Sequence, residues 1–210
     1  MYTHVHDSVF ASLNYMPIRE RANEANNAAL KKDTGKDKSE TYYSIFKDAA
    51  KNNVFYHDKI RTVDYQYQEQ PPLFLWKIKP NKKVVAGYKC QQAFTAFGGR
   101  IFEAWFTRDI PVSEGPYKFY GLPGLIVKVS DTHHNYVFEL ISFEGAPKPF
   151  VISANSSAPL ISKAKFKQAK INDELTFIDQ MTSWGNIIPP GMQKDYFEKL
   201  KRQNNPLELK

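Results

Sequence analysis

Cys90 is the one side chain of this sequence that is a natural nucleophile, and it is the chain's only cysteine. It lies in a strand-like stretch in which Tyr88 and Gln92 share its face. A nucleophilic cysteine needs a base that lowers its pKa, and no histidine is near it in the sequence. We therefore expect a buried, inert thiol. A catalytic cysteine, served by a histidine that approaches in space, stays open as an alternative.

Histidines provide the second group with possible chemistry. His4 and His6 are two residues apart, a spacing that puts both imidazoles on one face of a strand and suits a metal ion. His57 and the adjacent pair His133 and His134 could add ligands only if the fold brings them close. Because no carboxylate or thiolate occurs at ligand spacing, we expect neither a metal nor another cofactor, with His4 and His6 as the candidates if a metal binds.

Carboxylates and sequence motifs give no catalytic pattern. Asp109 follows Arg108 and precedes Ile110-Pro111, where an aspartate is typical of a turn because it binds its own backbone. The sequence contains no paired carboxylates, no Ser-His-Asp order, no phosphate loop and no dinucleotide fingerprint. We predict that this protein is not an enzyme.

Aromatic residues offer a binding surface instead. Several bulky side chains occur within or near a stretch rich in proline and glycine, which fix the backbone path. If they project from the end of a sheet, they form an apolar mouth for a ligand or partner; if they fold inward, they fill the sheet's core. The candidate binding residues are Trp105, Tyr117, Phe119, Tyr120, Leu122 and Pro123.

The stretch from Gly115 to Val129 is the centre of this arrangement. Pro123-Gly124 is the pair that a type II turn favours at its central positions, and the β-branched run from Leu125 to Val129 predicts a strand after it. Phe97-Gly98-Gly99-Arg100 predicts a hairpin that joins strands over 84–97 and 100–107. In the second of these strands aromatic residues fall on both faces, which places the hairpin centrally in a sheet.

Short aromatic or β-branched runs separated by polar breaks continue this pattern from Tyr42 to Phe143. Their close succession favours antiparallel pairing over parallel βαβ order. Helices are expected near the C-terminus, over 164–170 with Ser162 as the N-cap and over 191–202 after Pro189-Pro190. The polar segment 19–38 is either a short surface helix or a long exposed loop. The predicted fold is mainly β (α+β), a single curved antiparallel sheet or half-barrel with short C-terminal helices packed on or beside it.

Length and composition predict one domain over 1–210, with a mobile polar loop over 19–40 and a helical segment over 160–203. The net charge is +7, but the lysines and arginines are scattered and no nucleic-acid-binding motif accompanies them. We expect the cationic runs, such as 77–83, to be solvated faces, with no nucleic acid as partner. No apolar run is long enough for a transmembrane segment.

Three segments resemble the GLPGLI family: 87–93, 99–112 and 115–126, the last with the intact hexapeptide from Gly121 to Ile126. The resemblance is specific from Trp76 to Phe143 and extends to the closing Asn205-Pro-Leu-Glu-Leu209. It implies an exported bacterial protein of the periplasm or outer membrane, with no established activity and no catalytic residues. Because the sequence begins without the charged and apolar regions of a signal peptide, this location rests on the resemblance alone.

The function predicted at this level is that of a non-catalytic binding or accessory protein of the bacterial envelope. Its partner would be an apolar ligand, a peptide, or a periplasmic or outer-membrane protein. The alternative is a metal-binding protein or enzyme that uses Cys90 and the histidines.

Overall fold

A computed structural model describes residues 8–11, 43–48, 51–143, 157–202 and 207–208. The chain divides into two compact units, residues 1–71 with 151–167 and residues 72–150 with 168–210. The predicted loop over 19–40 lies outside the described residues. No helix of the described part is long and apolar enough to cross a membrane.

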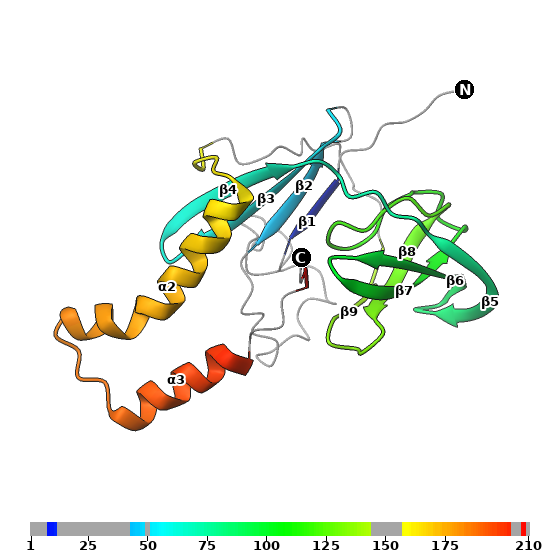
Figure 1. The fold of residues 1–210 in the computed structure, drawn as a ribbon. Helices are drawn as coiled ribbons and strands as arrows, with labels where there is room; N and C mark the ends of the chain where they lie inside the picture. The colour runs from blue at the N-terminus through cyan, green and yellow to red at the C-terminus, as the bar shows by residue number, and fades with distance from the viewer. Residues whose placement is uncertain (1–7, 12–42, 49–50, 144–156, 203–206, 209–210) are drawn as a thin grey trace, which may run out of the picture. The chain divides into compact units, whose positions relative to one another are not determined.

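The first unit contains a four-stranded antiparallel sheet in the order β1-β2-β3-β4 (Figure 1). Its strands are β1 (Ser8–Ala11), β2 (Ser44–Asp48), β3 (Asn53–Ile60) and β4 (Val63–Glu69). The ring of Phe166 lies beside this sheet, with its centroid 5.8 Å from that of Tyr56 and 5.5 Å from that of Tyr67. The start of the first helix thus packs against the aromatic face of the sheet.

The second unit contains a five-stranded antiparallel sheet whose strands follow chain order, β5-β6-β7-β8-β9. The strands are β5 (Lys77–Val85), β6 (Tyr88–Phe97), β7 (Arg100–Thr107), β8 (Leu125–Asp131) and β9 (Val137–Glu139). Gly98 and Gly99 form the two-residue turn between β6 and β7, and both have positive φ. Glycine adopts this backbone conformation without strain. The predicted hairpin is confirmed, and β7 is the central strand.

Two helices follow, α2 (Lys163–Ser183) and α3 (Pro190–Arg202). Ser162 caps α2 as predicted, since its Oγ accepts a hydrogen bond from the Lys165 N–H at 3.2 Å. In the second unit α2 and α3 form a hairpin: the Phe177 and Tyr196 ring centroids are 5.1 Å apart, and the Tyr196 hydroxyl donates to the Glu174 carbonyl at 2.9 Å.

The prediction of a mainly β, antiparallel fold is confirmed. The strands form two sheets, however, where a single sheet was expected. Chain order and short turns do not reveal this division, because only residues 70–76 separate β4 from β5. Prolines at positions 71 and 72 lack the N–H that a sheet ladder requires there.

Candidate functional site

The predicted apolar mouth is a core in the structure. Tyr117, Phe119 and Leu122 are buried, Tyr120 is half-buried, and Pro123 is exposed. These side chains therefore correspond to the inward arrangement and do not form an open rim.

Phe119 shows why they turn inward. It is 0% exposed, and its ring centroid lies 4.8 Å from that of Phe102, 5.3 Å from that of Phe74 and 5.5 Å from that of Phe97. Phe102 and its neighbours on the same face of β7 are fully buried, so the sheet needs large apolar side chains to cover this face. The segment before β8 provides them.

Hydrogen bonds fix this cover in place. The Trp76 indole N–H donates to the Tyr120 carbonyl at 2.8 Å, and the Tyr120 hydroxyl donates to the Pro72 carbonyl at 3.0 Å.

The predicted type II turn at Pro123-Gly124 is wrong in detail. The Leu125 N–H donates to Ile110, and the Gly124 N–H to the carbonyl two residues earlier, so the closing bond of a type II turn is replaced.

Glu208, near the end of the chain, reaches the same segment. The Glu208 carboxylate lies 2.6 Å from the Lys118 ammonium and accepts a hydrogen bond from the Tyr117 hydroxyl, also at 2.6 Å. Lys118 is 1% exposed, and a charge so deeply buried requires a partner. Glu208 thus neutralises the one lysine of the Gly115–Gly124 segment.

Trp105 lies on the opposite face of β7. It is buried with Val85, Cys90 and Val127, and the Lys83 ammonium is 3.9 Å from its ring centroid. Its indole N–H donates to the Glu103 carboxylate at 2.8 Å. The structure therefore does not bring Trp105 together with the other predicted binding residues.

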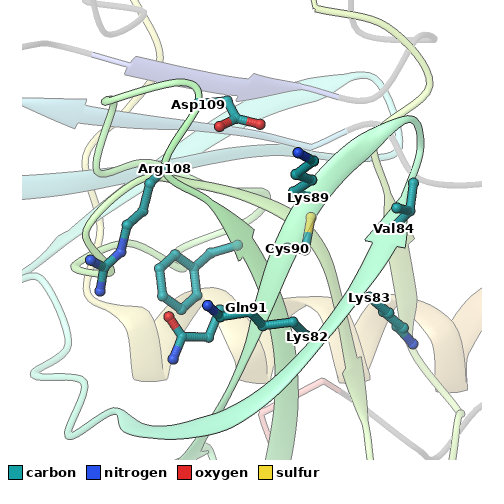
Figure 2. A pocket seen from close by; sticks show the side chains of 9 residues that line it. Lys82, Lys83, Val84, Lys89, Cys90, Gln91, Arg108 and Asp109 are labelled. Carbon is teal, nitrogen blue, oxygen red and sulfur yellow. The ribbon is translucent and has the colours of Figure 1, made fainter.

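A hollow of about 390 Å³ lies where β5, β6 and the end of β7 meet (Figure 2). Strand register explains its lining, because residues directly opposite one another in an antiparallel pair share a face. Lys82 lies opposite Gln91, which lies opposite Phe106, and Val84 lies opposite Lys89. Cys90, Lys83, Arg108 and Asp109 complete the lining. Buried Phe106 supplies its apolar floor, whereas the Cys90 side chain packs with Trp105 on the other face of the sheet.

Cationic side chains dominate the rim of the hollow. Lys82, Lys83, Lys89 and Arg108 are exposed, and Asp109 is the single carboxylate among the lining residues. Lys83 is engaged with the Trp105 ring, whereas no ion pair of Lys82, Lys89 or Arg108 occurs within the described residues. Figure 2 shows Asp109 and Lys89 toward one end of the hollow and Gln91 and Lys82 toward the other. The arrangement favours a ligand that carries negative charge.

Cys90 is not equipped for nucleophilic chemistry in this hollow. Burial raises the pKa of its thiol, nearby Asp109 adds to the rise, and a backbone hydrogen bond at Val85 and the charge of Lys83 oppose it only in part. The thiol stays protonated at neutral pH and lies 3.4 Å from the Tyr88 carbonyl, which can accept its hydrogen. No histidine lines the hollow.

The histidines are not gathered into a metal site in the described part of the chain. Burial lowers the pKa of His57, although Asp64, whose carboxylate is 3.2 Å from Nε2, and Asp58 partly oppose this. His133 and His134 are exposed in the turn after β8. No group of three or more His, Cys, Asp or Glu side chains that could hold a metal ion occurs there. His4 and His6 lie outside the described residues.

The lysine-rich segment 77–83 is exposed as expected, but the sequence analysis did not find the hollow beside it. The available signal was the register across the Ala86-Gly87 turn, which sets Lys82 and Val84 opposite Gln91 and Lys89. In the pairing of β6 with β7, Cys90 lies opposite Thr107, so continuing this register by one residue puts Arg108 opposite Lys89. Predicting that these cations lie close together requires strand boundaries that are accurate to one residue.

Comparisons with known proteins yield a family match and a limited structural likeness. No curated protein matches the chain. Two solved structures, titled "Structure of PNGF-II in C2 space group" and "Structure of PNGF-II in P21 space group", are 13% and 14% identical to it, with TM-scores of 0.46 and 0.47. Each alignment covers 64% of this chain, which spans about a quarter (25%) of the length of those proteins. Residues 99–128, from the start of β7 into β8, match the model of a family described as a protein of unknown function (Porph_ging).

Proposed function

We propose that this chain is a non-catalytic binding or accessory protein of the bacterial envelope, of the GLPGLI type, and that it takes an anionic ligand in the hollow of its second sheet. The envelope location and the GLPGLI name rest on the resemblance of the segments 87–93, 99–112 and 115–126. The single observation that carries the binding site is the set of three cations, Lys82, Lys89 and Arg108, around one hollow with an apolar floor.

The size and lining of the hollow define the ligand. A volume of about 390 Å³ falls in the lower part of the range typical of small-molecule sites. A carboxylate or phosphate can accept charge-assisted hydrogen bonds from Lys89 and Arg108, and arginine can bind such a group through two parallel bonds. An apolar body of a few carbon atoms would lie over Phe106. The ligand class is therefore a small amphipathic anion or an anionic side chain of a peptide.

The absence of a base beside Cys90 and the raised pKa of its thiol argue against the enzymatic alternative. A ligand that binds here meets cations, an amide and an apolar floor. These groups orient and neutralise an anion, and the described residues place no activated nucleophile next to it.

Isothermal titration calorimetry with phenyl phosphate tests the proposal. The wild-type chain should bind this probe, and the double variant Lys89→Gln, Arg108→Gln should bind it at least about tenfold more weakly, because each charge-assisted hydrogen bond contributes about 1.5 kcal/mol or more. Binding should weaken as salt is added.

The matched control is Lys77→Gln. Lys77 is an exposed lysine of β5, the strand that pairs with β6, but it does not line the hollow. If the control weakens binding as much as the double variant, the effect is one of overall charge and the site is wrong. Equal binding of phenol, which lacks the phosphate, would also contradict the proposal.

A further inference from the structure

The stretch that leads into β5 and β6 carries positive charge and no carboxylate. The chain has 22 Asp and Glu residues, yet none of them occurs over residues 70–102. The same stretch contains six lysines and arginines. Arg100 is buried, and the other five are exposed: Lys77, Lys79, Lys82, Lys83 and Lys89. No acidic neighbour within this stretch offsets their charge, so its surface is positive.

Three of these lysines belong to the free edge of the second sheet. β5 is the first strand of that sheet and pairs only with β6 (Figure 1). The register between β5 and β6 shifts between Ile78 and Lys82, so Lys79 lies in the irregular part of the strand. No ion pair in the described part of the chain includes Lys77, Lys79 or Lys82. Their ammonium groups are therefore available to an external anion.

The segment that precedes β5 adds apolar side chains to the same edge. Leu73 is 83% exposed and Leu75 73%, whereas Phe74 and Trp76 are half-buried. The ring centroids of Phe74 and Trp76 lie 5.3 and 6.3 Å from that of Phe119. Alternate residues of an extended chain point to opposite sides, so the packing of the two aromatic rings turns both leucines outward.

Protection of an edge strand against aggregation does not account for this combination. Lysines and a proline do hinder the addition of another strand, and Pro80 lies in the irregular part of β5. That role alone would not leave two leucines exposed beside the lysines. A second copy that met this edge strand to strand would set lysine against lysine.

Nucleic acid also fits this edge poorly. Proteins that bind single strands offer exposed aromatic rings on which bases stack. No aromatic side chain over residues 70–102 is in the exposed class. The combination of exposed lysines and exposed leucines instead matches an anionic surface with an apolar layer beneath it.

We propose that residues 73–82, here called the β5 edge, dock onto a lipid bilayer that contains anionic phospholipids. The lysine ammonium groups lie at the headgroup phosphates, and the two leucines enter the shallow apolar region below them. Charge and apolar contact act together, because either signal alone gives only marginal attachment. Only Lys82 is shared with the hollow, so this inference goes beyond the proposed function and does not depend on it.

Co-sedimentation of the full chain with vesicles at physiological ionic strength tests the proposal. The chain should bind vesicles of phosphatidylcholine mixed with phosphatidylglycerol, and should bind pure phosphatidylcholine at least about tenfold more weakly. The double variant Lys77→Gln, Lys79→Gln should lower the partition coefficient about tenfold or more. Leu73→Ser, Leu75→Ser should lower it about tenfold, from the apolar area that no longer leaves water.

Two matched controls change exposed side chains elsewhere. Lys165→Gln, Lys167→Gln removes two exposed lysines of α2 and alters the net charge by the same amount. Ile141→Ser, Ile187→Ser removes two apolar side chains that are 98% and 96% exposed. Both controls should partition as the wild type does.

Several results would each overturn the proposal: no vesicle binding, equal binding to charged and uncharged vesicles, an equal loss in the α2 control, or undiminished binding of the leucine variant. A dimer that Leu73→Ser, Leu75→Ser dissociates, without vesicle binding, would overturn it too. The phenyl phosphate titration tests the hollow separately. Lys77→Gln, Lys79→Gln should leave that titration unchanged, so the two proposals fail independently.

Discussion

Arg100 and Asp131 form an ion pair that is almost inaccessible to solvent, with Nη1 and Oδ2 3.3 Å apart. Asp131 also accepts hydrogen bonds from the Tyr136 N–H at 2.8 Å and the Asn135 side-chain amide at 3.0 Å. Burial alone would raise the pKa of Asp131, but these hydrogen bonds and the Arg100 charge outweigh it, so the pKa is lowered. Both oxygens of this carboxylate tie the start of β7 to the turn after β8.

Asp131→Asn should lower the free energy of unfolding at pH 7 by about 3 kcal/mol, because it leaves Arg100 without its buried counter-charge. A lowered folded-state pKa contributes stability above the unfolded value of about 3.9, and that contribution is lost as pH falls through the folded pKa. Urea unfolding at several pH values should therefore show a difference between wild type and variant that is constant at neutral pH and shrinks below about pH 4. The exposed Asp179→Asn variant is the control, and a difference that grows in acid would contradict the account.

Cys90 should react with a thiol reagent only when the protein unfolds. The thiol is 2% exposed and burial raises its pKa, so both access and the thiolate fraction are low. The measurement is the rate of reaction with dithionitrobenzoate at pH 8, with and without urea. Fast reaction of the folded protein would revive the catalytic-cysteine alternative.

At the scale of elements, the segment between β7 and β8 is held by one very close backbone approach. A Cβ atom at Gly124 would lie 1.9 Å from the Thr107 carbonyl oxygen, and φ at this position is +144°. No side chain fits there without moving the end of β7. The glycine is required for packing as well as for its backbone conformation.

Gly124→Ala should therefore destabilise the protein by about 3 kcal/mol or more, since strain and steric conflict add. Gly87→Ala is the matched control: its φ is +83°, but nothing lies within 4 Å of the new methyl group. The control should cost about 1 kcal/mol, from backbone strain alone. If thermal or urea unfolding shows that the two variants lose the same amount of unfolding free energy, the steric conflict with Thr107 makes no contribution to stability.

Local patterns predicted the elements whose signal lies within a few residues. The Gly98-Gly99 turn, the alternation of β7 and the Ser162 cap follow from turn chemistry and side-chain period, and the structure confirms them. The orientation of Tyr117 and Phe119 could not be predicted in the same way. It depends on Phe74, Phe97 and Phe102, which are distant in sequence, and on Glu208 at the chain's end.

At the scale of the whole molecule, the division into two sheets and the hollow of the second sheet both arise from tertiary arrangement. The sequence carries an excess of seven positive charges, and their scatter along the chain suggested solvated faces. Register brings Lys82, Lys89 and Arg108 from three segments to one hollow. Lysines and arginines that are far apart in the sequence can thus lie close together in the folded sheet.

Nuclear magnetic resonance titration with phenyl phosphate tests the central claim most directly, because it reports where an anion binds. The account predicts that backbone amide signals of residues 82–91 and 108–109 shift first and saturate together, while those of 117–123, the segment once expected to bind, stay unchanged. Shifts centred on 117–123, or no saturable shifts around the hollow, would contradict it.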